Sequence, residues 1–195
     1  MGLCLAQAAL LRGAEVDLVH GPLTAPDALR EGLRCHPITT AADLEAALDR
    51  LQPQASAIAM AAAVADHRRA APRADKIAKQ ELEAALSGGW ETVPDLLAGL
   101  VARRPQGQRL LGFAAYSGTD LQPVRAKFAR KGCDLLFANP IDSPGAGFAA
   151  STNTGWLLGP GPQETRLEHA SKLAIAHRLL SALAMSLDES QASGS

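Results

Sequence analysis

A buried strand near the middle of the chain is the feature that most restricts the fold. Residues 57–64 are apolar on both faces of a strand, and Asp66 and His67 follow. Such a strand is typical of the centre of a parallel sheet that helices cover on each side. Ligands of open α/β sheets bind beyond the carboxyl ends of the strands. Asp66 is therefore a candidate site residue, although a charged loop leaving a core strand is a common alternative.

The rest of the chain alternates between short strands and amphipathic helices. Strands are predicted at residues 16–20, 57–64, 109–115 and 134–138, and a hairpin at 156–167. Helices are predicted at residues 2–12, 40–51, 92–103, 120–131 and 169–187, with a loop over 24–39 and an irregular excursion over 66–92. Their predicted ends are a Thr40–Asp43 capping box, Thr92 and Asp95 as caps of a helix with Pro94 in its first turn, and Gly132 just after the helix at 120–131. This pattern predicts an α/β fold: a Rossmann-like three-layer domain over residues 1–187, with a mostly parallel sheet and an edge hairpin. Residues 188–195 are expected to form a disordered tail.

Composition restricts the partners of the chain. Lys and Arg number 19 against 20 Asp and Glu, so no overall charge favours nucleic acid or an anionic membrane, and phosphate binding has to be local. The three cysteines are far apart and lack the spacing of a metal site. With no apolar run of membrane-spanning length, we expect a cytoplasmic protein.

Three predicted strands end in small residues followed by a polar one. These ends are Ala65-Asp66, Ala114-Ala115 and Ala138-Asn139. In a parallel sheet they meet at one edge, where small residues let backbone N–H groups approach a ligand closely. Lys127 and Lys131 share one helix face and are candidates for anion contacts, although they also suit the carboxyl end of a helix. Pro94-Asp95 reads either as a helix cap or as part of this site.

Taken together, these segments resemble a known family. The chain is similar to the phosphopantothenate–cysteine ligase (phosphopantothenoylcysteine synthetase) domain of bacterial coenzyme A biosynthesis. The matching segments, in order, are Met1-Gly2, Arg12 to Val16, Ala62 to Asp66, Lys76 to Lys79, Pro94 to Leu97, Gly112 to Ala115, Lys127 with Lys131, Ala138-Asn139 and Gly147-Phe148. The match extends over nearly the whole chain, to about residue 187.

The resemblance implies a reaction and a set of site residues. The family joins 4′-phosphopantothenate to cysteine, and its bacterial members use CTP through an acyl-cytidylate. Lys76 is implied as the catalytic lysine, and Asp66 as a nucleotide contact, through the ribose or an associated Mg²⁺. The remaining nucleotide contacts implied are Met60, Ala61, Ala62, Pro94, Asp95, Leu96, Leu97, Phe113, Lys127 and Lys131, and the substrate contacts are Ala138 and Asn139. A homodimer is implied as well.

The sequence also departs from the family pattern. Tyr116 and Pro140 stand where the family has acidic residues, and the first strand and Gly-rich turn that precede the Met-Gly pair are not in the sequence. The resemblance therefore predicts that a chain starting at Met1 lacks acyl-cytidylate formation. Two alternatives stay open: an inactive nucleotide-binding remnant or assembly partner of the ligase, and a dinucleotide-dependent oxidoreductase, for which no Gly-x-Gly-x-x-Gly motif is present.

Overall fold

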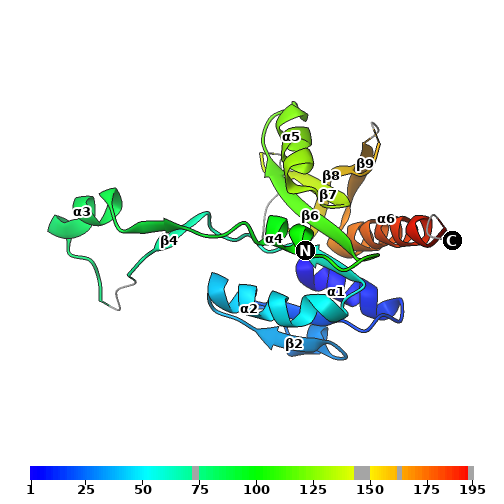
Figure 1. Ribbon diagram of the computed structural model, residues 1–195, viewed down its shortest axis with the longest axis horizontal. Helices are drawn as coiled ribbons and strands as arrows, with labels where there is room; N and C mark the ends of the chain where they lie inside the picture. Colours follow the sequence, from blue (N-terminus) through cyan, green and yellow to red (C-terminus); the bar gives the residue numbers. More distant parts are fainter. Residues whose placement is uncertain (72–74, 143–149, 162–163, 193–195) are drawn as a thin grey trace.

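A five-stranded sheet forms the centre of the protein. The structure, a computed structural model, describes residues 1–71, 75–142, 150–161 and 164–192. In spatial order the strands are β3 (Ala57–Met60), β6 (Arg109–Tyr116), β7 (Leu135–Pro140), β8 (Thr152–Leu158) and β9 (Thr165–Ser171). The first three run parallel, and β8 and β9 add an antiparallel hairpin at one edge. The predicted mostly parallel sheet with an edge hairpin is confirmed (Figure 1).

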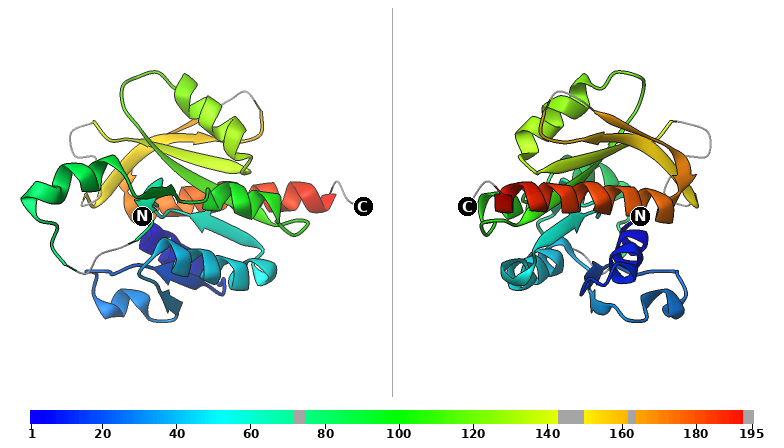
Figure 2. Two further views of the ribbon diagram at one scale, coloured as in Figure 1. Left: turned by 60° about the vertical axis from the view of Figure 1, so that its left-hand side comes forward. Right: turned by 90° about the vertical axis from the view of Figure 1, so that its right-hand side faces the viewer.

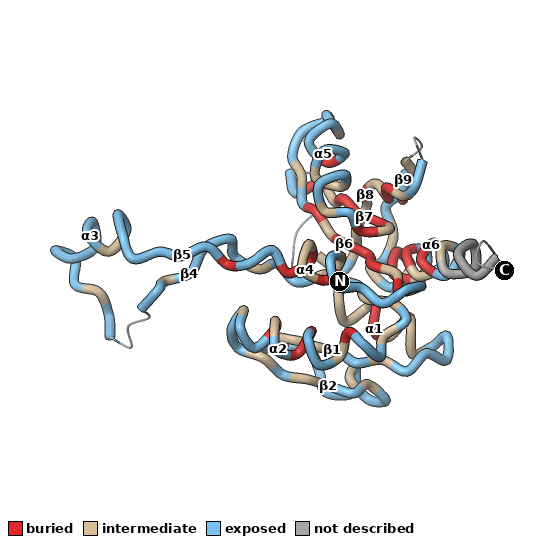
Figure 3. Tube along the Cα trace, viewed as in Figure 1, coloured by how far each residue is buried: buried red, intermediate tan, exposed pale blue. Residues whose placement is uncertain are grey.

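Helices cover both faces of this sheet, as the three-layer prediction requires (Figure 2). On one face α1 (Gly2–Leu11) and α6 (Lys172–Ala192) pack against Leu111 and Phe137. On the other face α2 (Ala41–Leu51), α4 (Leu96–Ala102) and α5 (Gln122–Lys131) pack against Leu110 and Leu136. Neighbouring residues of β6 and β7 thus enter opposite cores, which is why these strands are apolar on both faces. Figure 3 shows the buried residues gathered along these elements.

The strand predicted at residues 57–64 is shorter than expected and lies at an edge. The hydrogen-bonded strand ends at Met60, and the Ala61 N–H then donates to the Ala59 carbonyl. Within the part of the chain that the structure describes, β3 pairs with β6 alone, and β1 (Asp17–His20) and β2 (Arg34–Pro37) form a separate parallel pair. The prediction of a central strand over 57–64 was therefore wrong. The residues of β3 are apolar on both faces because helices pack on both faces of the sheet. This pattern does not indicate that a strand lies on each side of β3.

β2 lies inside the segment predicted to be a loop, residues 24–39, which also holds a short 3-10 helix, Asp27–Arg30. The strand was missed because its residues are polar. Arg34 pairs with Asp17 across the two strands at 2.7 Å, and with Glu15 at the same distance. Cross-strand charge pairing and backbone bonds therefore stabilise this pair of strands, with little burial of apolar side chains.

The predicted irregular excursion over 66–92 is an arm that projects from the body (Figure 1). It contains β4 (His67–Arg69) paired with β5 (Trp90–Thr92), and a 3-10 turn, Lys79–Glu81, that leads into α3 (Leu82–Ser87). The Arg69 guanidinium ties these elements together, because it donates to the Ala85 and Gly88 carbonyls and lies over the Trp90 ring.

The ends of the helices test the capping predictions. Thr40 and Asp43 form the predicted capping box, and Gly132 ends α5 in the left-handed conformation, with φ of 66°. Asp95 caps α4 as predicted, but Pro94 lies before the helix and not in its first turn. The final helix starts at Lys172, since β9 continues through Ser171, and it extends to Ala192. Among the described residues, no helix is both long enough and apolar enough to span a bilayer.

A buried amide pair joins the helices to the sheet at the end opposite the candidate site. Gln52 and Gln108 are only 3% and 2% exposed. The Gln52 amide donates to the Leu100 carbonyl at 2.8 Å and to Gln108 Oε1 at 3.0 Å, while Gln108 donates to the Ala55 carbonyl at 2.6 Å. Arg103 donates to Gln52 Oε1 at 2.9 Å. Each amide thereby satisfies groups that would otherwise be buried without a partner.

Removing the Gln52 amide should destabilise the fold. In Gln52→Ala the Leu100 carbonyl and Gln108 Oε1 lose their donor, and an unsatisfied buried group costs about 1–3 kcal/mol. We expect urea unfolding to give a free energy of unfolding lower by that amount. The control is Gln54→Ala, an exposed neighbour, which should change the free energy by less than about 0.5 kcal/mol. Equal effects of the two substitutions would contradict this account.

Candidate functional site

The carboxyl ends of three parallel strands meet at one edge of the sheet. Met60 of β3 is in register with Gly112 of β6, and Ala115 of β6 is in register with Asn139 of β7. Two of the three strand ends predicted to converge, Ala114-Ala115 and Ala138-Asn139, lie together at this edge. Ala65-Asp66 does not end its strand, because β3 ends at Met60, and the segment from Met60 to Ala62 lies at this edge instead. Only part of this edge is accessible: Ala115 is exposed, and Ala62 is exposed just beyond β3, whereas Ala114 and Ala138 are buried.

Hydrogen bonds tie the start of α4 to Asp66, which precedes β4, and to α5. The Val93 N–H donates to the Asp66 carbonyl at 2.9 Å, and the Asp95 carboxylate caps α4 by accepting the Ala98 N–H at 3.1 Å. Lys131, on α5, donates to the other oxygen of Asp95. The structure thus brings together Asp66, the Pro94–Leu97 segment and Lys131. The Leu96 and Leu97 side chains are buried, so only their backbone can face a ligand.

Asp95 is held as a carboxylate by its neighbours. Burial raises its pKa, but the hydrogen bonds from Lys131 and the Ala98 N–H outweigh burial and bring the pKa below its ordinary value of 3.8. The Asp66 carboxylate differs, because it has no hydrogen-bond or ion-pair partner among the described residues and is exposed. The same holds for Lys127, which is half-buried on α5. These two charged groups are free to contact a ligand.

Phe113 and Lys76 are placed differently from the other predicted residues. Phe113 packs edge-on against Phe137, with ring centroids 5.9 Å apart, on the α1 and α6 face of the sheet. Lys127 and Lys131 come from α5 on the opposite face. Lys76 is exposed on the arm, in the segment between β4 and α3, which Figure 1 shows away from the sheet. Lys76 is therefore not brought to the strand ends in this structure. The matched pair Gly147-Phe148 lies outside the described residues.

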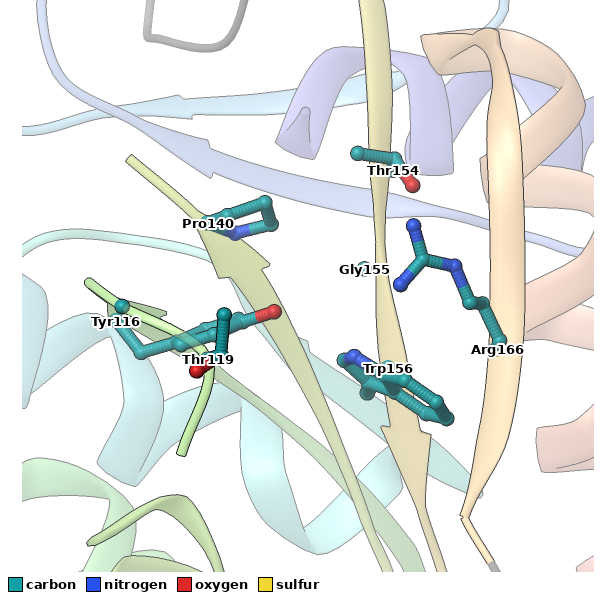
Figure 4. A pocket seen from close by; sticks show the side chains of 8 residues that line it. Tyr116, Thr119, Pro140, Thr154, Gly155, Trp156 and Arg166 are labelled. Atoms are coloured by element: carbon teal, nitrogen blue, oxygen red, sulfur yellow. The ribbon is translucent and has the colours of Figure 1, made fainter. Parts of the chain in front are cut away.

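A cavity at the same edge was missed by sequence reasoning. It has a volume of about 230 Å³ and lies where β6 and β7 end, facing β8 and β9 (Figure 4). Its lining residues are Tyr116, Gly118, Thr119, Pro140, Thr154, Gly155, Trp156 and Arg166. Gly155 makes the close packing of β8 on β7 possible, because a side chain there would overlap the Ala138 carbonyl oxygen. The sequence signals were the rare aromatic residues and the presence of Tyr116 and Pro140 where the family has acidic residues.

The acidic groups present suit Mg²⁺ held through a ligand better than a metal held by the protein. Among the described residues, no three or more His, Cys, Asp or Glu side chains cluster as metal ligands. Mg²⁺ commonly binds through one or two carboxylates together with substrate phosphates and waters. The unpartnered carboxylate of Asp66 fits that pattern.

Comparisons with known proteins identify the family. Residues 1–187 match the family described as the DNA/pantothenate metabolism flavoprotein C-terminal domain. The chain belongs to this family. It is 37% identical over 191 residues to the coenzyme A biosynthesis bifunctional protein CoaBC of Mycobacterium tuberculosis, covering 93% of this chain and 45% of that protein. For the Escherichia coli K12 protein of the same name the identity is 35% over 158 residues, covering 78% and 37%. The chain spans less than half the length of these curated relatives.

Solved structures agree with this assignment. A crystal structure of the C-terminal domain of CoaBC has a TM-score of 0.75 and 25% identity, and covers 96% of this chain and 84% of that one. A mutant of Cab2 in complex with phosphopantothenate-cysteine shares the fold, with a TM-score of 0.72 at 17% identity over 99% of this chain and 79% of that one. The resemblance predicted from the sequence, and the α/β fold that it implied, are confirmed.

The Asp95–Lys131 pair should make stability depend on pH. Because the pKa of folded Asp95 is lowered, its stabilising contribution is complete above about pH 4 and is lost as the pH falls through the folded-state pKa. Asp95→Asn keeps a good helix cap but removes the charge. We expect its free energy of unfolding to be lower than that of wild type by up to about 1 kcal/mol at pH 6, with the difference shrinking as the pH falls below about 4.

The matched control is Lys131→Gln, which removes the other half of the pair. The double variant should be no less stable than Asp95→Asn alone, because both substitutions remove one interaction. A difference between Asp95→Asn and wild type that stays constant from pH 6 to pH 2 would rule out the ion pair as its source.

Proposed function

We propose that this chain is the ligase domain that joins 4′-phosphopantothenate to cysteine at the expense of CTP, in coenzyme A biosynthesis. Membership of the family and its curated relatives supports the ligase class. The observation that carries the proposal is the edge where three parallel strands end, with the small residues Ala61-Ala62 just after β3 and Ala115 one residue before the end of β6. Backbone groups at such an edge suit a nucleotide.

The proposed reaction has two steps. A carboxylate oxygen of phosphopantothenate attacks the α-phosphorus of CTP, forming an acyl-cytidylate as the bond to pyrophosphate breaks. The amine of cysteine then attacks the acyl carbon, the C–O bond to CMP breaks, and the amine gives up a proton as the amide forms. Lys127 and Lys131 would contact the phosphates, Ala138 and Asn139 the substrate, and Phe113 the cytosine from the opposite face of the sheet.

Mg²⁺, when bound, would neutralise phosphate charge, and Asp66 is the residue placed to hold it together with the nucleotide. The Met60 to Ala62 and Pro94 to Leu97 backbone would frame the nucleotide. For Lys76 to offset charge on the acyl-cytidylate, the arm has to move toward the strand ends. A flexible point charge on a mobile segment suits such closure.

A second candidate is a protein that binds the nucleotide without carrying out ligation. The observation that favours it is the lack of backbone pairing between β3 and the β1–β2 pair among the described residues, which leaves the edge of β3 next to the site without a strand partner. CTP binding alone would be the whole activity in that case, and the chain would serve as a partner in a larger assembly.

Titration calorimetry and a pyrophosphate assay test both candidates. CTP should bind more tightly than NAD, and pyrophosphate release should require both CTP and 4′-phosphopantothenate. Binding of CTP without pyrophosphate release would establish the second candidate. Tighter binding of NAD than of CTP would overturn both and favour an oxidoreductase.

Lys76→Ala tests the role of the arm, in the form of the protein that releases pyrophosphate. Loss of one electrostatic contact made only in the transition state lowers turnover about 100- to 1,000-fold, whereas the dissociation constant for CTP should change little. Lys79→Ala is the control, since Lys79 lies on the same exposed segment. Full turnover by Lys76→Ala would falsify the assignment.

A further inference from the structure

The cavity between β6, β7, β8 and β9 is lined by hydrogen-bond donors and has no role in the account above. It contains the single tyrosine of the chain, Tyr116, and one of its two tryptophans, Trp156. At about 230 Å³ it is smaller than the usual pocket of a drug-sized ligand. The occupant that fits is therefore a small molecule or one end of a larger one.

Arg166 gives this cavity its charge. Its guanidinium lies over the Trp156 ring, 5.3 Å from the ring centroid, and Figure 4 shows it pointing toward Gly155. Its Nε is 3.3 Å from Glu168, an exposed neighbour on β9. No acidic residue is among those that line the cavity. The terminal nitrogens of Arg166 have no partner among the described residues, so they can bind an oxyanion through two parallel N–H···O hydrogen bonds.

Other donors surround the guanidinium. Among the described residues, the Trp156 indole N–H and the Tyr116 hydroxyl have no hydrogen-bond partner, and both groups line the cavity. The Thr154 hydroxyl donates to the Leu167 carbonyl at 2.8 Å and so presents lone pairs. A cavity with one cation, several donors and no carboxylate favours an acceptor group with a single negative charge. A carboxylate carries one negative charge and therefore fits this cavity better than a phosphate monoester, which carries nearly two.

We propose that this cavity binds the carboxylate of the amino-acid substrate, cysteine, through Arg166, and this assignment rests on the proposed ligase function. Tyr116 and Pro140 are the paired last residues of β6 and β7, so the cavity directly adjoins Ala115 and Asn139 at the candidate site. The small thiol side chain would pack on the Trp156 ring, since sulfur makes favourable contacts with aromatic rings. The absence of a lining carboxylate avoids trapping the amine as an ammonium ion, and the amine has to be neutral to attack.

Tryptophan fluorescence tests the proposal directly. Trp90→Phe removes the exposed tryptophan of the arm and leaves Trp156 as the only one. In that background, L-cysteine under reducing conditions should change the emission saturably. Cysteamine, which keeps the amine and thiol but lacks the carboxylate, should bind at least about tenfold more weakly than L-cysteine. L-cysteine should bind to the Arg166→Gln variant more weakly by a similar factor, because in both cases a hydrogen-bonded charge pair is lost. Arg166→Lys keeps the positive charge but lacks the paired N–H donors of the guanidinium, so its affinity for L-cysteine should lie between those of wild type and Arg166→Gln.

The control variant is Arg125→Gln. Arg125 pairs with Glu164 and does not line the cavity, so cysteine should bind to this variant as to wild type. Equal binding of cysteine and cysteamine, unchanged binding to Arg166→Gln, or tighter binding of inorganic phosphate than of cysteine would each overturn the proposal. The titration needs no CTP, so its result is separate from that of the pyrophosphate assay. Saturable cysteine binding without pyrophosphate release would count against the ligase function and not against the cavity.

Discussion

The parallel pairing of β3, β6 and β7 is the constraint on which the rest of the structure depends. Because β6 and β7 are covered by helices on both faces, their residues enter two cores in alternation, with Leu111 and Phe137 on one side and Leu110 and Leu136 on the other. A shift of one residue in either strand would exchange the two faces. The register is therefore fixed by packing, and with it the common edge at which the three strands end.

Everything proposed for the site follows from that edge. It places Ala115 beside Asn139, and it sets the end of β6 beside the cavity that Trp156 and Arg166 line from the antiparallel strands. The bond between Lys131 and Asp95 fixes α5 against the start of α4 on one face. The arm is the exception, because it is connected to this framework only through its two strands. A residue on the arm can reach the site of its own chain only if the arm moves.

The local sequence pattern predicted much of the fold but not all of it. The apolar runs and capping residues predicted the buried strands and most helix ends, because each depends on residues close together in sequence. β2 was missed because its stability comes from Arg34 pairing with Asp17, which a search for apolar runs does not detect. The cavity was missed for a related reason. Tyr116, Trp156 and Arg166 lie on three strands, and the parallel pairing of β6 with β7 together with the antiparallel pairing of β7, β8 and β9 brings them together. Likewise, the sequence around Lys76 does not indicate how far this lysine lies from the sheet.

The central claim is that a nucleotide binds where β3, β6 and β7 end, beside the start of α4. Amide hydrogen exchange with and without saturating CTP tests it most directly, because a bound ligand slows the local opening of the segments it contacts. The account predicts slower exchange over residues 60–66, 94–98 and 113–116, with the β1–β2 pair unchanged as an internal reference. Protection confined to β1 and β2, or no protection in any of these segments when calorimetry shows CTP bound, would contradict it.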